Sequence, residues 1–238
     1  MDPTGEAGGI FPQFADRRSQ QRHRELQFRR RQSDLGDSSA SDPSVEAAWL
    51  LGLTIDCRSP PQRRRKSARI VAGTPLGVRR RLAAATESFW LRDAPQTPSL
   101  VIAIVDGDGQ QHNWNNLARA ADVASRLADA GGTIVVCCDV TQSPGRSLRR
   151  LAMDAPFEET LKLVRKDISS DAFAANLLVR IREEYRILLA TGLPSETLED
   201  LGLGAIESIT GLQHLIDQHA TAIVVRGAQF CSAVADNR

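Results

Sequence analysis

The sequence predicts an α/β protein in which a layered sheet of mostly parallel strands carries helices on both faces. Its apolar runs are continuous rather than alternating, as strands covered on both faces require. The runs occupy residues 99–106, 131–140, 186–193 and 221–228. Segments with helical periodicity separate the runs, and the connecting loops are short. The hydrophobic content of 42% in 238 residues is enough for one sizeable core with additional material.

The first part of the chain is basic and poor in aliphatic residues. Up to residue 92 the sequence holds 17 Lys and Arg against 10 Asp and Glu, whereas residues 93–238 hold 13 against 19. Residues 1–43 are rich in Arg, Gln, Asp and Ser, and we expect a flexible, largely disordered basic segment there. Nucleic acid is not an expected partner, because aromatic residues are few among the arginines and no helix-turn-helix or zinc pattern accompanies them.

Between this segment and residue 92, the pattern predicts two helices and a pair of strands. A short helix is expected within 42–53, where Asp, Pro and Ser supply an N-terminal signal. Two short strands, 53–59 and 67–73, flank a basic turn. Apolar residues at helical spacing then predict an amphipathic helix over 75–91.

From residue 99 the pattern is a βαβ unit followed by further alternation of helices and strands. Its helix is expected over 113–130, and Gly131 with Gly132 is expected to supply a left-handed C-cap. Later helices are expected over 156–167, 169–185, 194–203 and 208–220. Ser169 or Ser170 is the expected N-cap of the second of these. We therefore expect one α/β domain over 44–232 and a tail over 233–238.

The loop after the first of these strands is the first candidate for a functional site. In open parallel sheets, ligands lie beyond the carboxyl ends of the strands, which places the loop at 106–113 where a site would be. Asp106, Asp108 and His112 could converge on a divalent metal ion, and the N-terminus of the next helix could hold an anion. Asp, Gly and Asn are also what a tight turn and a helix N-cap need for geometry alone. Both interpretations stay open at this point.

Several classes of site have no support in the sequence. Gly107 and Gly109 give G-x-G, but His112 stands where a dinucleotide fingerprint needs its third glycine. There is no P-loop sequence and no nucleophile elbow. His214 and His219 have no nearby ligand set at metal spacing, and we expect them to be solvated.

Targeting signals and cysteine spacing give a broad expectation about location. No apolar run reaches the roughly 18 residues that a membrane span needs, and the start lacks the pattern of a secretory signal. We therefore expect a cytoplasmic protein. The four cysteines have no metal-binding or redox spacing and are expected to be core thiols. They are Cys57, Cys137, Cys138 and Cys231.

The stretch around the candidate loop resembles the C-terminal domain of the nickel-pincer lactate racemases. In that family an Asp ends a strand, a polar loop follows, and a helix leads to a "GGTI" strand, as here at Asp106, at 112–121 ("HNWNNLARAA") and at 131–134. The later stretches "ATGLPSETLEDLGL" and "AIVVRGAQ" are also similar. Asn116 stands where the family has a substrate-contacting Gln, and Arg119 stands where it has a Lys. The resemblance implies that both contact a small carboxylate, which an Arg can bind through two oxygens.

The sequence departs from the family in the catalytic half. The family's N-terminal domain carries two proton-moving histidines, an arginine, and a Gly-Gly-x-Lys segment whose lysine anchors the nickel-pincer nucleotide. Residues 5–23 resemble the edge of that segment, but no lysine follows Gly8 and Gly9, and His23 lies one residue out of register with a nickel-ligating histidine. The resemblance implies a divergent or truncated 2-hydroxy acid racemase, an isomerase that we expect not to catalyse alone.

Two other functions remain open. The chain is alternatively a non-enzymatic module that binds a small carboxylate or another anion through the loop from Asp106 to Asn113, which holds Asp108 and His112, together with Arg119. A further alternative is an interaction protein that uses its basic N-terminal segment. If the racemase interpretation holds, the partners are a hydroxycarboxylate and a domain or chain that supplies the missing half.

Overall fold

The structure is a computed structural model of the 238-residue chain, and it describes residues 16, 18–19, 49–58, 70–78, 80–82, 91–94, 97–153 and 155–235. The chain divides into two compact units, Met1–Leu91 and Arg92–Arg238. Apart from residues 16, 18 and 19, the flexible segment expected over 1–43 lies outside the described residues. The predicted domain limits, 44 and 232, stay predictions.

The first unit contains the expected strand pair. β1 (Asp56–Arg58) pairs with β2 (Val71–Gly73) in antiparallel fashion, with Cys57 opposite Ala72. Residues 75–78 and 80–82 are helical, which agrees with the first part of the helix expected over 75–91. Leu91 differs, because it is the first residue of the strand β3 (Leu91–Ala94); β3 lies mainly in the second unit and pairs there with β9 (Ser232–Ala235). Pairing with a strand far along the chain overrides the local pattern there.

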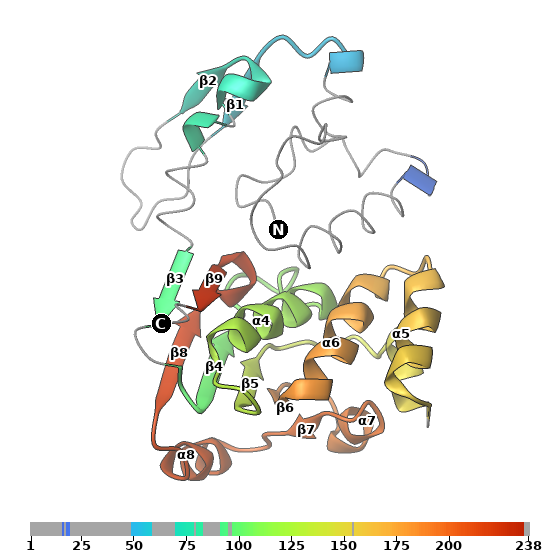
Figure 1. The fold of residues 1–238 in the computed structure, drawn as a ribbon, viewed down its shortest axis with the longest axis vertical. Helices are drawn as coiled ribbons and strands as arrows, with labels where there is room; N and C mark the ends of the chain where they lie inside the picture. Colours follow the sequence, from blue (N-terminus) through green and yellow to red (C-terminus); the bar gives the residue numbers. More distant parts are fainter. Residues whose placement is uncertain are drawn as a thin grey trace. The chain divides into compact units, whose positions relative to one another are not determined.

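The second unit is built on a parallel five-stranded sheet in the order β7-β6-β5-β4-β8. Its strands are β4 (Leu100–Ile104), β5 (Thr133–Cys137), β6 (Arg186–Ala190), β7 (Gly204–Ala205) and β8 (Ala222–Arg226). The chain proceeds from β4 outward to β7 and then returns to place β8 on the other side of β4 (Figure 1). The predicted fold class is confirmed, and β4 is an inner strand.

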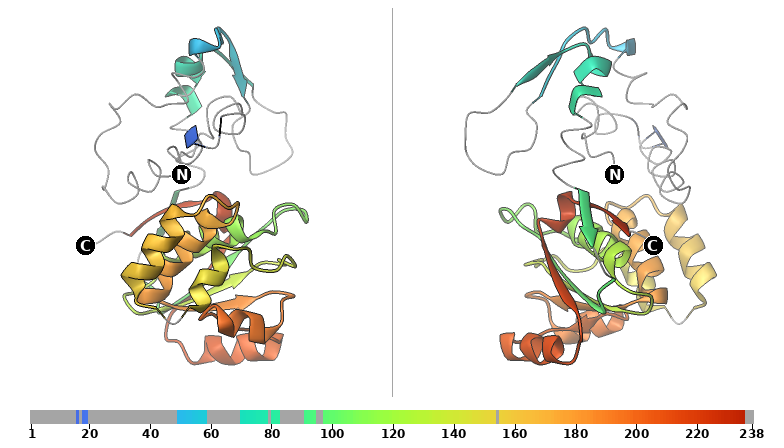
Figure 2. Two further views of the ribbon diagram at one scale, coloured as in Figure 1. Left: turned by 90° about the vertical axis from the view of Figure 1, so that its right-hand side faces the viewer. Right: turned by 60° about the vertical axis from the view of Figure 1, so that its left-hand side comes forward.

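Two long helices cover one face of the sheet, which we call the α4 face. α4 (Trp114–Leu127) packs against β4 and β5, and α6 (Ala172–Glu184) packs against α4 and β6. α5 (Phe157–Lys166) lies against α6 on its outer side, as Figure 2 shows. The short helix η2 (Leu148–Ala152) contacts α5 and α6, while η3 (Ala228–Phe230) and β9 contact α4. Leu117 and Leu178 are fully buried in this layer.

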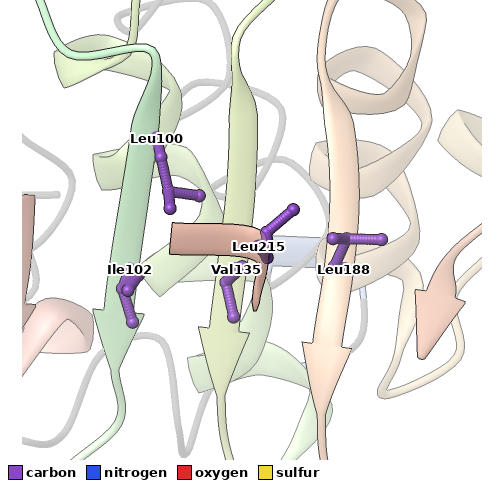
Figure 3. Close-up of a cluster of buried hydrophobic side chains, with 5 residues drawn as sticks. All are labelled: Leu100, Ile102, Val135, Leu188 and Leu215. Carbon is purple, nitrogen blue, oxygen red and sulfur yellow. The ribbon is translucent and has the colours of Figure 1, made fainter. Parts of the chain in front are cut away.

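Among the described residues, the nine-residue helix α8 covers the opposite face, which we call the α8 face. α8 (Ile209–Asp217) places Leu215 against a buried cluster from β4, β5 and β6 (Figure 3). The cluster contains Leu100, Ile102, Val135 and Leu188. α7 (Ser195–Asp200) lies beside the edge strand β7. Helices therefore cover both faces, as predicted.

The helix ends explain two differences from the sequence expectations. α4 ends at a C-cap, Ala128, in extended conformation, and the left-handed residue Gly131, with φ +72°, comes later, in the turn before β5. The N-cap of α6 is Asp171 rather than Ser169 or Ser170. The Asp171 carboxylate does not cap its own helix, because Oδ2 accepts a hydrogen bond of 3.0 Å from the Leu148 N–H. A long-range bond thus replaces the expected local cap.

Candidate functional site

The carboxyl ends of β4, β5, β6 and β8 meet at one edge of the sheet, because all four strands are parallel. The direction of strand addition reverses between β4 and β8, so the topological switch point lies there. Ligands of open α/β sheets bind in the crevice outside such a point. The predicted loop at 106–113 follows β4 directly and lies at this position (Figure 1).

The side chain of Gln229 fixes the start of this loop. The Asp106 N–H donates to Gln229 Oε1 at 3.2 Å, and Gln229 Nε2 donates back to the Asp106 carbonyl. Gln229 is only 2% exposed, so these bonds are shielded from water. Gly227 adopts φ +62° beside them, and a Cβ there would lie 3.7 Å from Asp106 Oδ2. The segment after β8 therefore holds the end of β4 in place.

Asp106 also forms an ion pair across the switch point. Its Oδ1 lies 3.5 Å from Nη2 of Arg226, the last residue of β8. The Arg226 side chain is 76% exposed and that of Asp106 is 40% exposed, so water weakens this attraction. Sequence reasoning did not identify Arg226 or Gln229, because nothing local indicates that β8 pairs with β4.

Asp108 and Gly107 shape the turn that follows. Asp108 Oδ1 accepts from the Gln110 N–H at 3.1 Å, and its carbonyl accepts from the Gln111 N–H at 2.9 Å. Gly107 has φ +127°, and a Cβ there would meet the Gln111 side chain at 2.5 Å. These contacts are those of a tight turn, which supports the geometric interpretation of this part of the loop. The Asp108 residue itself is exposed.

His112 connects the loop after β4 to the loop after β5. Its Nδ1 accepts from the Asp139 N–H at 3.0 Å, so the neutral ring carries its proton on Nε2. In the part of the chain that the structure describes, no group of three or more His, Cys, Asp or Glu side chains is placed to hold a metal ion. The structure therefore does not bring Asp106, Asp108 and His112 together as a metal centre.

Asn116 is almost entirely buried and binds the loop rather than facing outward. Its Nδ2 donates to the Gln111 carbonyl at 2.9 Å and to Gln111 Oε1 at 3.1 Å. Its N–H is capped by Asn113 Oδ1 at 3.0 Å. These three hydrogen bonds stabilise the turn where it enters α4.

Arg119 lies on a different side of α4. The centre of its guanidinium is 5.2 Å from the centroid of the Phe173 ring on α6, a cation–π geometry. One turn earlier, Asn115 Nδ2 donates to the Ser170 carbonyl at the start of α6. Arg119 therefore lies toward α6. The other four predicted site residues lie in the loop or at its end, and they are Asp106, Asp108, His112 and Asn116. A binding role for these five residues remains a prediction.

Cysteine chemistry has little support at this edge. Burial raises the pKa of the Cys138 thiol to about 12, and the charge of Asp139 adds to this effect. Burial also raises the pKa of Cys137. Both thiols therefore stay protonated near neutral pH and are poor nucleophiles. Cys138 and Cys231 are buried, as expected, whereas Cys57 is exposed.

Comparison with known proteins yields structural matches only. No family model and no curated protein matches the sequence. The lactate racemase apoprotein from Thermoanaerobacterium thermosaccharolyticum superposes with a TM-score of 0.66 at 14% identity, over 82% of this chain and 48% of that one. The chain has a lactate racemase-like fold. A Thermotoga maritima protein from a structural genomics consortium matches with a TM-score of 0.56 at 11% identity, over 82% and 52% of the two chains.

The chain spans about half the length of these two proteins. At this level of sequence identity, the matches support a similar fold but not a similar activity. Within the described residues, no helix has the length and apolar character needed to cross a membrane.

Proposed function

We propose that the chain is a divergent or truncated lactate racemase-like protein whose α/β unit binds a small hydroxycarboxylate at the carboxyl edge of its sheet. The observation that supports this most is the switch point between β4 and β8, where the loop at 106–113 lies in a racemase-like fold. The backbone of Asp106 is held from both sides by Gln229, which gives a ligand a fixed frame.

We also propose that this chain does not catalyse racemisation alone. Racemisation at a carbon needs acid/base groups on opposite faces of the substrate and an electron sink. At the candidate edge, His112 Nδ1 accepts a hydrogen bond from the Asp139 backbone N–H. His219 lies elsewhere in the fold, where its Nδ1 is 3.1 Å from Ser99 Oγ. A partner domain or chain would supply the missing groups, and the isomerase activity would belong to the assembly.

The residues present do not fit the nickel-pincer nucleotide that the fold family implies. No lysine follows Gly8 and Gly9, and the first lysine of the sequence is Lys66. The described residues also offer no cluster of metal ligands. No step of the proposed function is therefore assigned to this group.

Binding can be tested with D- and L-lactate added to the ¹⁵N-labelled full chain. We expect amide shifts concentrated in residues 106–113 and 226–229, together with a rise in the unfolding temperature over a chloride control. An absence of shifts with lactate and with a panel of other 2-hydroxy acids would contradict the binding proposal. Interconversion of the lactate enantiomers by the purified chain alone, with nickel bound stoichiometrically, would contradict the catalytic part.

Arg119 provides a matched pair of variants for the residue that the resemblance singles out. We expect Arg119→Ala to remove the lactate-induced rise in unfolding temperature. Arg126→Ala, on the same helix and with its side chain 41% exposed, should retain it. Equal behaviour of the two variants would exclude Arg119 from the site and leave the loop to be tested separately.

A further inference from the structure

A row of four residues crosses the sheet at its carboxyl edge on the α8 face. Strand register pairs Ala190 with Cys137, Cys137 with Ile104, and Ile104 with Arg226. Neighbours in register project from the same face of a sheet. Ile104 and Cys137 pack beside the α8 cluster, which identifies that face. The row is thus apolar along three strands and cationic at the fourth.

This row is more open than the row before it. Leu188, Val135 and Ile102 occupy the preceding positions and are buried beside Leu215 of α8 (Figure 3). Ala190, Cys137 and Ile104 are only half-buried, and Arg226 is exposed. A nine-residue helix covers the middle of the strands and leaves their carboxyl ends partly uncovered.

Arg226 retains capacity to bind an anion. Its ion pair with Asp106 has one nitrogen–oxygen contact at 3.5 Å, whereas a guanidinium carries five N–H donors. The hydrogen bonds of Gln229 to the Asp106 backbone keep this residue beside the end of β8, within reach of Arg226. Asp106 therefore both positions the guanidinium and competes with an incoming oxyanion.

We propose that this row binds a carboxylate with an unbranched apolar tail, the oxyanion on Arg226 and the tail across Ile104, Cys137 and Ala190. Three strand spacings give the row a length of about 14 Å, which suits a medium-chain tail. The charge of Arg226 at one end of an apolar surface selects an amphiphilic anion over a neutral or fully polar ligand. This inference goes beyond the proposed function, because it adds a ligand class with an apolar tail and a surface formed by Ile104, Cys137 and Ala190 on the α8 face, next to the loop proposed to bind lactate.

The test is an NMR titration of the ¹⁵N-labelled full chain with butyrate, hexanoate and octanoate. Each buried methylene should tighten binding up to about fourfold, and the amides of Ile104, Cys137 and Arg226 should move. Hexanol, which has the tail without the carboxylate, should bind more weakly than hexanoate. Inorganic phosphate, which has the charge without the tail, should bind more weakly than octanoate.

Variants separate the oxyanion contact from a general charge effect. Arg226→Gln should weaken binding of the three carboxylates by a similar factor, about tenfold. Arg186→Gln is the matched control, because Arg186 is the exposed first residue of β6 at the opposite edge, and affinity should not change. Asp106→Asn should tighten binding by removing the competing charge. Glu183→Gln, with the same charge change at the exposed end of α6, should have no effect.

Three results would overturn this inference: an affinity independent of tail length, an affinity unaffected by Arg226→Gln, or phosphate binding as tight as octanoate. Lactate binding is measured in a separate titration. Octanoate binding without lactate binding would contradict the proposed function and support this inference. Lactate binding without octanoate binding would support the proposed function and contradict this inference.

Discussion

The two faces of the parallel sheet are covered unequally. On the α4 face, two helices of 14 and 13 residues cover the inner strands, and Val101 and Ala103 of β4 are 0% exposed. On the α8 face, the nine-residue helix α8 lies over the sheet, and its own residues Leu212 and Ile216 stay partly exposed. We infer that the α4 face supplies most of the stability of this unit.

The largest expected effect comes from opening a cavity in the α4 face. Leu178 on α6 is fully buried, and Leu178→Ala should lower the free energy of unfolding by about 3–5 kcal/mol, because close packing on all sides prevents collapse. Urea denaturation of the full chain followed by circular dichroism measures this change. A loss below about 1 kcal/mol would show that this face is loosely packed.

The same substitution on the α8 face should cost less. Leu215→Ala should lower the free energy of unfolding by about 2 kcal/mol, because the short helix can move toward the sheet and fill part of the space. Val224→Ala on β8 is the control, since Val224 is 59% exposed and should change stability by less than about 0.5 kcal/mol. If Leu215→Ala costs as much as Leu178→Ala, the proposed inequality of the two faces fails.

A third change tests the connection between β8 and the loop after β4. Gln229→Met keeps the size of the side chain but removes both hydrogen bonds to the Asp106 backbone, so we expect a loss of about 1–2 kcal/mol. Hydrogen exchange at the Asp106 amide should accelerate more than exchange in α6. Unchanged protection of Asp106 would mean that the loop does not depend on this clamp.

The local elements of this unit could be predicted from the sequence, but their arrangement could not. The apolar runs predicted β4, β5, β6 and β8 because a covered strand shows in its own residues. β7 has two residues and β9 follows the last predicted strand closely, so neither offers a measurable pattern. The pairing of β8 with β4 is a long-range contact, and the residues of β8 alone do not indicate which strand it pairs with.

The candidate site shows the same limit at the level of side chains. The loop at 106–113 could be found because polar residues follow a covered strand. The buried side chain of Asn116 donates to the Gln111 carbonyl, and this contact depends on the path of the loop. Arg119 lies over Phe173 of α6, and this contact depends on how α4 packs against α6. Neither property is local, and so residue types alone could not assign these roles.

The smallest expected effect is a pH dependence within the layer of the α4 face. Arg150 donates from Nε and an Nη to the two carboxylate oxygens of Asp167, at 2.6 and 3.1 Å, and Ser147 Oγ donates to Oδ2 at 3.0 Å. The hydrogen bond from Arg150 is the main cause that lowers the pKa of Asp167 from its ordinary value of 3.8. The pair fastens η2 to the C-terminal end of α5.

A carboxylate whose pKa is lower in the folded than in the unfolded state stabilises the fold at pH values above its ordinary pKa. This contribution is lost as the pH falls through the pKa of the folded state. The free energy of unfolding should therefore decrease as the pH drops below about 4, and Asp167→Asn should flatten this part of the profile. Arg150→Gln should flatten it similarly, because it removes the main cause of the shift. Urea midpoints between pH 2.5 and 6 measure the profiles, and parallel curves for all three proteins would show that this pair contributes nothing to the α4 face.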